Sequence, residues 1–367
     1  MKKALYIVTS MDTGGAETVF MKYYRALDKS RYQLDFCVSS DVPGFYDAEI
    51  ESMGGRIVHT VKKTEAGPVA SFKRLMQIAR DGGYCCAVRS SQHSLSCLYL
   101  LAMRFGGVSR TIFRSSNTGT VSNSKKETLL HNLFKPLVRV AATDFAAPST
   151  EAGVYMFGKA GVSGPRFHLM KNALNLEDYA YDASTRDDVK RELGVSAESY
   201  VVGHVGRFSE QKNHLFLVDV FAEIARRRPD AVLILVGKGE TRTAVERRVA
   251  ELGLTDRVVF AGVRSDVRRL YSAMDVFIFP SVYEGLPNVV VEAQANGLPC
   301  VISDSITREV GICENVVYKS LGDALDEWAD AALSADRIGS SASARDLKGS
   351  GYEINSELPG FVRLVFG

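Results

Sequence analysis

Two glutamates bracket a short turn and an apolar run in the segment EGLPNVVVE. Glu284 and Glu292 lie eight positions apart, which is too far for neighbours on one helix face. Pro287 is suited to the first position of a helix that continues from Asn288 to Ala295. Glu284 then precedes the helix and Glu292 lies more than one turn inside it. Both carboxylates can therefore face one ligand, beside the free amides of the first helical turn.

Two cations form a second candidate group. Arg207 and Lys212 lie in the segment HVGRFSEQKNH, which follows a predicted strand. A guanidinium fork and an ammonium point charge can hold a diphosphate together, although a solvated loop explains them equally well in isolation. Further on, LVGKGE places a glycine turn, Gly237 to Gly239, at the carboxyl end of the next strand. Ligands bind at that edge in sheets of this kind.

A third group is the pair Gly14 and Gly15, between the first predicted strand and the first predicted helix. Glycines at this place let backbone N–H groups approach an anion at the positive end of the helix dipole. The segment MDTGGAETVF is not the dinucleotide fingerprint GxGxxG. A tight turn from strand to helix is the simpler explanation of the pair taken alone.

The elements that must position these groups alternate between strand and helix, and the alternation restarts after about residue 200. Strands are predicted in ALYIVTS, LDFCVSS, RIVHTV, DFAAPST, SYVVGHVGRF, AVLILVGKG, DRVVFAGV and DVFIFPS. Helical periodicity covers ETVFMKYYRALDKS, VASFKRLMQIARDGG, NHLFLVDVFAEIARRRP and RTAVERRVAELGL. Two such runs predict an α/β protein with two doubly wound, Rossmann-like domains.

A chain of 367 residues, 46% hydrophobic and 24% charged, is ordinary for a soluble two-domain protein. The domains are predicted at 1–172 and 173–349, because turn formers and acidic residues interrupt the pattern near 172–185. The end of the chain, about 350–367, is too apolar for a free tail and is predicted to pack back onto the N-terminal domain. The basic start is interpreted as a first strand rather than a signal peptide.

Charge and cysteines restrict the class further. Six cysteines show no CxxC pair and no histidine at metal spacing, which favours a reduced, cytoplasmic protein. No charge-free apolar run approaches the roughly 18 residues of a membrane span. Residues 1–175 carry a net charge of +10 and the remainder −8. The basic half predicts an anionic partner such as a membrane surface or a phosphorylated acceptor. The alternative is that the excess charge faces water and has no partner. No nucleic-acid partner is expected.

The segment SNSKKETLLHNLFKPLVRV, at 122–140, mixes basic and apolar residues. This mixture suits a helix that lies on an anionic membrane. An ordinary amphipathic helix packed on its own domain is the alternative.

Several motifs occur in an order that resembles one family. They are GGAE, GRFSEQKN, VGKGE, FAGV, DVFIFPS and EGLPNVVVEAQANGLP. Over most of its length the chain resembles the retaining glycosyltransferases of family 4, which have the GT-B fold of two Rossmann-like domains facing a central cleft. Through GVSRTIFRSSNT and MKNALNLEDY it is also similar to bacterial enzymes that build capsular, exopolysaccharide or O-antigen repeat units.

The resemblance implies a role for each candidate residue. Glu292 would accept hydrogen bonds from the ribose hydroxyls of the donor, and Glu284 would contact the transferred sugar. Arg207 and Lys212 would bind the diphosphate, and the loop Gly14-Gly15 would close on it from the other domain. The backbone near the sugar and the diphosphate would be that of Gly285, Leu286, Pro287, Asn288 and Val289.

The implied reaction moves a hexose from a nucleotide sugar, expected to be a UDP-sugar, to a saccharide acceptor, expected to be lipid-linked. Fixed cations and amides would stabilise the negative charge of the leaving diphosphate. No DxD-type metal motif is evident, so Arg207 and Lys212 would replace a divalent cation, and neither metal nor cofactor is expected. Retention would follow the front-face route, in which the leaving phosphate helps to deprotonate the acceptor hydroxyl.

The chain departs from the family where relatives have histidines, at the end of the fourth N-terminal strand and in a later HSHN-like segment. Arg89, Ser91, Arg114 and Ser116 stand there instead. His93 is displaced by two residues and is a candidate catalytic histidine, or else a helix-start or core residue. Arg114 could contact an anionic group on the donor or the acceptor.

Three functions follow. The first is a cytoplasmic transferase, peripheral at the inner face of the plasma membrane. The second is a catalytically silent GT-B partner that binds nucleotide sugar or supports another transferase; the missing histidines favour it, whereas the intact Glu284, Glu292, Arg207 and Lys212 argue against it. The third is a GT-B nucleotide-sugar epimerase, which would carry a different set of carboxylates and histidines.

Overall fold

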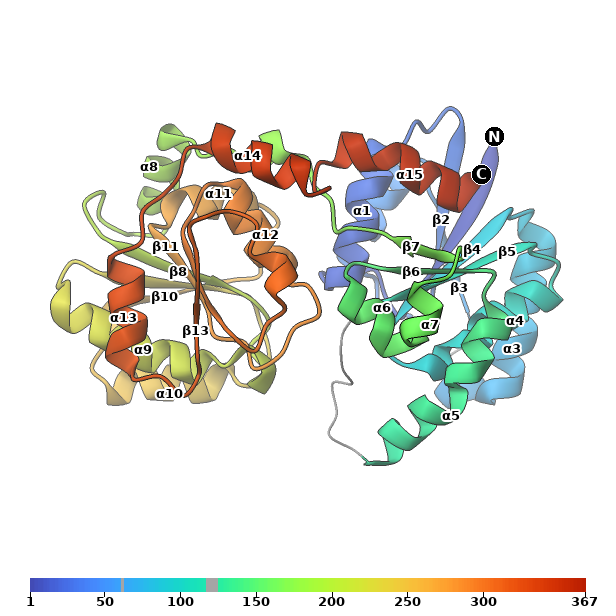
Figure 1. The fold of residues 1–367 in the computed structure, drawn as a ribbon, viewed down its shortest axis with the longest axis horizontal. Coiled ribbons are helices and arrows are strands. Elements are labelled where there is room, and N and C mark those ends of the chain that lie inside the picture. Colours follow the sequence, from blue (N-terminus) through green and yellow to red (C-terminus); the bar gives the residue numbers. More distant parts are fainter. Residues whose placement is uncertain (61–62, 117–124) are drawn as a thin grey trace. The chain divides into compact units, whose positions relative to one another are not determined.

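The computed structural model describes residues 1–60, 63–116 and 125–367, and the side chains of all of these except 63–66 and 125–127. The chain divides into two compact units, Met1–Leu174 with Glu353–Gly367 and Asn175–Tyr352. Each unit is built on one parallel sheet with helices on its faces (Figure 1). The predicted α/β class with two doubly wound domains is confirmed.

The first unit has a sheet of seven strands within the described residues, in the order β3-β2-β1-β4-β5-β6-β7. The strands are β1 (Lys2–Ile7), β2 (Tyr32–Val38), β3 (Ile57–His59), β4 (Cys86–Ser91), β5 (Arg110–Ser115), β6 (Asp144–Ala147) and β7 (Phe167–Leu169). The helices are α1 (Gly15–Ala26), α2 (Asp47–Ser52), α3 (Lys63–Gly82), α4 (Cys97–Phe105), α5 (Lys125–Ala141), α6 (Thr150–Phe157), α7 (Lys159–Val162) and, at the end of the chain, α15 (Ile354–Phe366).

The core of the first unit lies on both faces of its sheet. Residues of β1 alternate between the two sides: Tyr6 packs among the residues of α1 and α15, whereas Leu5 and Ile7 pack among those of α3 to α6. Central strands that are covered on both faces are apolar on both, which explains why their sequences read as continuous apolar runs.

The C-terminal helix α15 returns to the first unit and lies beside α1 (Figure 1). The ring of Phe361 stacks on Tyr23 with centroids 4.4 Å apart. Leu364, Val365 and Phe366 are also buried in this core. Each such side chain stabilises the fold by about 1.5–3 kcal/mol, so the last residues are part of the domain core although they follow the second unit in sequence.

The second unit has a sheet of six strands among its described residues, in the order β10-β9-β8-β11-β12-β13. The strands are β8 (Val201–Val205), β9 (Val232–Val236), β10 (Val258–Gly262), β11 (Val276–Phe279), β12 (Cys300–Ser303) and β13 (Val316–Lys319). The helices are α8 (Ala183–Glu192), α9 (His214–Arg227), α10 (Arg242–Glu251), α11 (Val267–Ala273), α12 (Asn288–Ala295), α13 (Leu325–Leu333) and α14 (Ser340–Gly349). Helices α9, α10 and α13 contribute to the core on one face.

The direction of winding reverses once in each sheet, between β1 and β4 in the first unit and between β8 and β11 in the second. At such a switch point the two flanking loops diverge at the carboxyl ends of the strands and leave room for a ligand. The loops after β1, β4, β8 and β11 are therefore where chemistry is expected. None of the helices in the described residues combines the length and apolar character that a membrane span needs.

Candidate functional site

The loop after β8 carries two of the predicted cations. It runs from Gly206 to a single 3-10 turn, Glu210–Lys212, and reaches α9 through Asn213. Asn213 has φ 56°, and it is the one non-glycine residue with positive φ in the described part of the chain. Asparagine tolerates this left-handed conformation better than most residues. The sharp turn places Lys212 at the edge of the sheet.

Two glycines let the loop after β9 lie against the loop after β8. A Cβ on Gly237 would lie 2.1 Å from the carbonyl oxygen of Gly206, and one on Gly239 would lie 2.2 Å from that of Phe208. Neither backbone atom can move away cheaply, so both positions require glycine. The N–H of Phe208 donates to the carbonyl of Lys238 at 3.0 Å. The predicted glycine turn VGKG is thus a contact between two loops.

The loop after β11 is joined to the loop after β8 by a partly buried ion pair. Lys212 Nζ donates to Glu284 Oε1 at 2.6 Å, and the two side chains are 17% and 11% exposed. Gln211 Nε2 donates to the same carboxylate oxygen at 3.1 Å and to the carbonyl of Tyr283 at 2.9 Å. The ammonium also lies 4.5 Å from the centroid of the Phe279 ring. These contacts hold Glu284 and Lys212 at the β8/β11 switch point.

Helix α12 begins at Asn288 and contains Glu292. The prediction that Pro287 is the first helical residue is wrong: its ψ is 109°, and its carbonyl accepts the N–H groups of Val290 and Val291. That is the behaviour of an N-cap, where the backbone is extended but already accepts helical bonds. Gly285 and Leu286 are buried before it, while Asn288 and Val289 are partly exposed in the first turn.

Glu292 is only 7% exposed. Its Oε2 accepts a hydrogen bond from the hydroxyl of Tyr271 at 3.0 Å. Burial, together with this carboxylate, raises the pKa of Tyr271 far above its ordinary value. The phenol therefore stays protonated and keeps the carboxylate oriented. Tyr271 was not among the predicted site residues, because 21 positions separate it from Glu292 and only the packing of α11 against the sheet brings the two together.

Arg207 lies in a different environment from Lys212. Its guanidinium pairs with Glu240 at 3.1 Å, and the two side chains are 73% and 57% exposed. The structure therefore places the two predicted phosphate ligands on one loop but gives them different partners. An exposed pair of this kind is worth about 0–1 kcal/mol, so Arg207 can exchange Glu240 for another anion at little cost.

In the first unit, Gly14 is the N-cap of α1 and Gly15 is its first residue, at the carboxyl end of β1. A Cβ on Gly14 would lie 2.1 Å from Glu17 Oε2. The carboxyl group of Glu17 therefore lies folded over Gly14, where burial raises its pKa. The motif GGAE contains this glutamate, but the sequence indicated only the two glycines.

His93 lies on the loop that follows β4, the other strand of this switch point. Its N–H donates to Ser91 Oγ at 3.1 Å, and its side chain is partly exposed. The N–H of the next residue, Ser94, donates to His131 Nδ1 at 3.1 Å. His93 is therefore at the predicted edge of the sheet, and its catalytic role stays a prediction.

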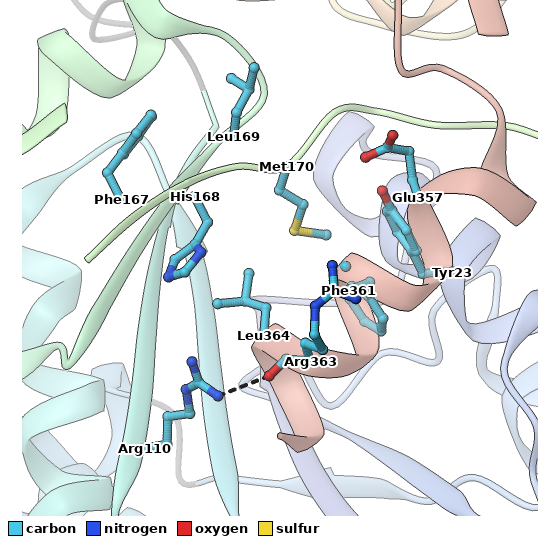
Figure 2. A pocket seen from close by; sticks show the side chains of 11 residues that line it. Tyr23, Arg110, Phe167, His168, Leu169, Met170, Glu357, Phe361, Arg363 and Leu364 are labelled. Carbon is cyan, nitrogen blue, oxygen red and sulfur yellow. Dashed lines mark hydrogen bonds between the residues drawn. The ribbon is translucent and has the colours of Figure 1, made fainter. Parts of the chain in front are cut away.

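A separate cavity of about 430 Å³ lies in the first unit between α15 and strands β5 and β7 (Figure 2). Arg110 and Phe167, the first residues of those strands, line it together with Phe361 and Leu364 of α15. Arg110 Nη1 donates to the carbonyl of Arg363 at 3.0 Å across its wall. Apart from the C-terminal helix that borders it, this cavity contains none of the residues predicted from sequence.

The part of the chain that a family model matches lies within the second unit. The model of the family described as "Glycosyl transferases group 1" matches residues 199–335, which include Arg207, Lys212, Glu284 and Glu292. A Bacillus subtilis protein named "Putative glycosyltransferase EpsF" is 34% identical over 340 residues, which is 92% of this chain and 88% of that protein. The chain belongs to the group 1 glycosyl transferases.

Solved structures of glycosyltransferases share the fold of this one. Anabaena Alr3699/HepE, in complex with UDP-glucose, superposes with a TM-score of 0.81 at 20% identity over 99% of this chain and 100% of that one. WaaG, a glycosyltransferase involved in lipopolysaccharide biosynthesis, has a TM-score of 0.72 at 14% identity over 99% and 100%. At these identities the likeness concerns the fold, and the predicted GT-B fold is confirmed.

Proposed function

We propose that this glycosyltransferase is a retaining hexosyltransferase of family 4 that transfers a sugar from a UDP-sugar to a saccharide acceptor in the synthesis of bacterial surface polysaccharide. The observation that carries the proposal is the partly buried Lys212–Glu284 pair at the β8/β11 switch point. It places a fixed cation and a fixed carboxylate at the edge where a nucleotide sugar binds in this kind of sheet.

The donor is proposed to lie along the second unit. Lys212, with Arg207 turning from Glu240, would neutralise the diphosphate, and the first turn of α12 would direct its amides toward the same group. Glu292 would accept the ribose hydroxyls, and Glu284 would orient the transferred sugar. Support for uridine comes from HepE, which was solved with UDP and with UDP-glucose. Neither metal nor cofactor is part of the proposal.

Bond cleavage would leave positive charge on the sugar and negative charge on the diphosphate. Lys212 is already oriented by Glu284, whose carboxylate also accepts a hydrogen bond from Gln211, so it can stabilise the leaving group without reorganisation. The leaving phosphate would then take the proton of the acceptor hydroxyl on the same face of the sugar, which retains the anomeric configuration. His93, Gly14 and Gly15 are proposed to border the acceptor and the phosphates from the first unit.

A lipid-linked acceptor is proposed because an Escherichia coli relative is named as a transferase of galactose from UDP-Gal onto a diphosphoundecaprenol-linked sugar. That relative is 32% identical over 142 residues, 38% of this chain and 37% of its own length. With such an acceptor, the enzyme would act at a membrane surface, the inner face of the plasma membrane.

Helix α5 supports the membrane part of the proposal. Residues 122–124 of the predicted segment, and the side chains of Lys125 and Lys126, lie outside what the structure describes. Leu129 and Leu133, one turn apart, are 69% and 68% exposed. The neighbouring apolar residues Leu130, Phe134 and Leu137 are partly buried. The helix thus packs on its own domain with one side and presents leucines with the other, and sedimentation with anionic liposomes at low salt tests whether these bind membrane.

The decisive experiment is a thermal-shift and hydrolysis screen over UDP, GDP, NAD and a panel of nucleotide sugars. Stabilisation by UDP together with slow hydrolysis of one UDP-sugar, abolished in Lys212→Ala, supports the proposal. If UDP stabilises the chain but no nucleotide sugar is hydrolysed and no sugar is transferred to an acceptor, the result would instead support the silent partner subunit. A response to NAD alone would contradict both.

A further inference from the structure

Two arginines lie at the carboxyl edge of the sheet in the first unit, at positions where the family resemblance implied histidines. Arg89 of β4 is opposite Ile7 and Phe113 in the strand register, whereas Arg114 of β5 is opposite Ser90. Because neighbouring residues of a strand point to opposite faces, the two side chains leave the sheet on opposite sides. Both are buried, with exposures of 9% for Arg89 and 2% for Arg114.

The hydrogen bonds of these two guanidinium groups are incomplete. Arg89 Nη1 donates to the carbonyl of Ile7 at 2.9 Å, and Arg114 Nη2 donates to Asn172 Oδ1 at 2.5 Å. The Nε atoms of both are buried and have no hydrogen-bond partner among the described residues. Neither arginine forms an ion pair with a carboxylate in the described part of the chain. A buried polar group is ordinarily satisfied, so unused donors at a ligand edge require a partner.

One carboxyl group interacts electrostatically with both arginines, and it is that of Glu17. It reaches the edge of the sheet from the first turn of α1, folded over Gly14. One carboxyl group can at most neutralise one of two guanidinium charges. The site therefore retains an excess of positive charge away from water, a costly arrangement that a bound anion would relieve.

We propose that Arg114, on the face of the sheet that α1 covers, binds an anionic group, a phosphate or a carboxylate, on the acceptor saccharide, and that Arg89 adds positive charge to the same edge from the opposite face. Guanidinium groups suit both anions because their planar donors match the paired oxygens. In the proposed function the charge of the donor diphosphate is neutralised by Lys212 and Arg207 of the second unit, and the first unit adds only the loop Gly14-Gly15. A guanidinium group of the first unit is then left for an anion of the acceptor; this step rests on the proposed function. The net charge of +10 on residues 1–175 favours such a substrate. The anion comes either from the diphosphate of a lipid carrier or from an acidic sugar.

The test is a calorimetric titration of inorganic phosphate into the full chain saturated with UDP, so that the donor site is filled. The variants are Arg114→Lys and Arg89→Lys, which keep the positive charge but lose the paired N–H donors of the guanidinium group. The matched control is Arg110→Lys. Arg110 lies on β5, as Arg114 does, and its guanidinium group pairs with Asp144 at 3.1 Å. We expect phosphate affinity to fall at least tenfold in Arg114→Lys and to stay unchanged in Arg89→Lys, which keeps its charge, and in the control.

Absence of phosphate binding to the UDP-saturated chain, or an equal loss in all three variants, overturns the inference and leaves the proposed function intact. Failure of UDP to bind would instead count against the proposed function. Competition then separates the two sources. Displacement of phosphate by glucuronate supports an acidic sugar, displacement by a short prenyl diphosphate supports a lipid carrier, and displacement by neither overturns the inference.

Discussion

The two units share one topology but treat charge at their switch points in opposite ways. In the second unit, Lys212 and Glu284 satisfy each other at 2.6 Å across two loops. In the first unit, Arg89 and Arg114 are more deeply buried, yet neither pairs with a carboxylate among the described residues. The cation of the second site is thus held by a carboxylate, whereas the two arginines of the first form no ion pair in the described part of the chain.

This difference has an energetic meaning. A cation that is already oriented by a carboxylate can stabilise developing charge without reorganisation, which suits a group that acts during bond cleavage. A cation that lacks a partner gains most when a charged substrate arrives, which suits a group that selects the acceptor. Under the two proposals above, the second unit would therefore carry the bond cleavage and the first unit would select the acceptor.

The largest expected effect is that of Lys212→Ala on catalysis. Loss of the ammonium removes the fixed charge opposite the leaving diphosphate, and we expect the rate of UDP-sugar hydrolysis or transfer to fall about 10²–10³-fold. Initial rates with saturating donor measure this. Lys348→Ala changes an exposed lysine of α14 and serves as the control. A loss of less than threefold in Lys212→Ala would show that the pair is only structural.

The two glutamates of the second unit should separate binding from transfer. We expect Glu292→Ala to weaken UDP binding about 10–100-fold, because each charge-assisted hydrogen bond contributes about 1.5–3 kcal/mol. Glu284→Ala should leave UDP affinity nearly unchanged and mainly slow transfer. Calorimetry with UDP and rate measurements on both variants test this, and equal effects on nucleotide affinity would contradict the assignment.

Stability should respond in opposite ways in the two units. Glu284→Ala leaves Lys212 partly buried without its partner, and we expect up to about 3–5 kcal/mol of destabilisation. Arg114→Met removes a buried charge that has no carboxylate partner, so the free energy of unfolding should change by less than about 1 kcal/mol or rise. Urea unfolding of both variants measures this. A comparable loss in Arg114→Met would mean that the arginine is already compensated.

The pH dependence of stability should be steeper in the second unit. Burial lowers the pKa of His214 to about 4 and that of His204 well below its usual value, while His131 of the first unit is lowered to about 4. The unfolded histidines bind protons near pH 6.5, so stability is intact above that pH and is lost between 6.5 and 4. His214 and His131 each contribute about 2 kcal/mol between pH 7 and 5, and His204 adds to the loss in the second unit.

Urea unfolding at pH 7 and pH 5, followed by a probe in each unit, measures this dependence. His214→Gln should reduce the loss of stability that the second unit shows between pH 7 and pH 5. The loss in the first unit should stay unchanged. If the two units lost stability equally on acidification, the buried histidines would not be the cause.

The smallest effect is expected at the exposed pair of the second unit. Glu240→Gln releases Arg207 from its salt bridge, and because both side chains are exposed, stability should change by less than about 0.5 kcal/mol. Donor affinity should stay equal or rise slightly, since Arg207 no longer exchanges one anion for another. Thermal unfolding and UDP calorimetry check this; a loss of affinity would show that Glu240 contacts the donor.

Local patterns in the sequence predicted the elements well. Helix α12 covers the predicted residues from Asn288 to Ala295, because its limits depend on neighbouring residues alone. The position of Pro287 was wrong by one residue, since an extended proline can cap a helix as well as begin it. The apolar end of the chain was predicted to return to the N-terminal domain, and its buried Phe361 lies in that core. The helix and the return of the chain's end could both be predicted because each depends on the residue types within one short segment.

The sequence alone determined the α/β class, the two sheets, the family and the candidate residues for donor binding, since these depend on periodicity and on ordered motifs. Only the tertiary structure decided which side chains meet. Lys212 and Glu284 are 72 positions apart, and their contact exists because β8 and β11 are neighbours in the sheet. Glu17 reaches the edge of the first sheet because Gly14 leaves room for it. The unpaired state of Arg89 and Arg114 depends on burial, which is a property of the packed chain.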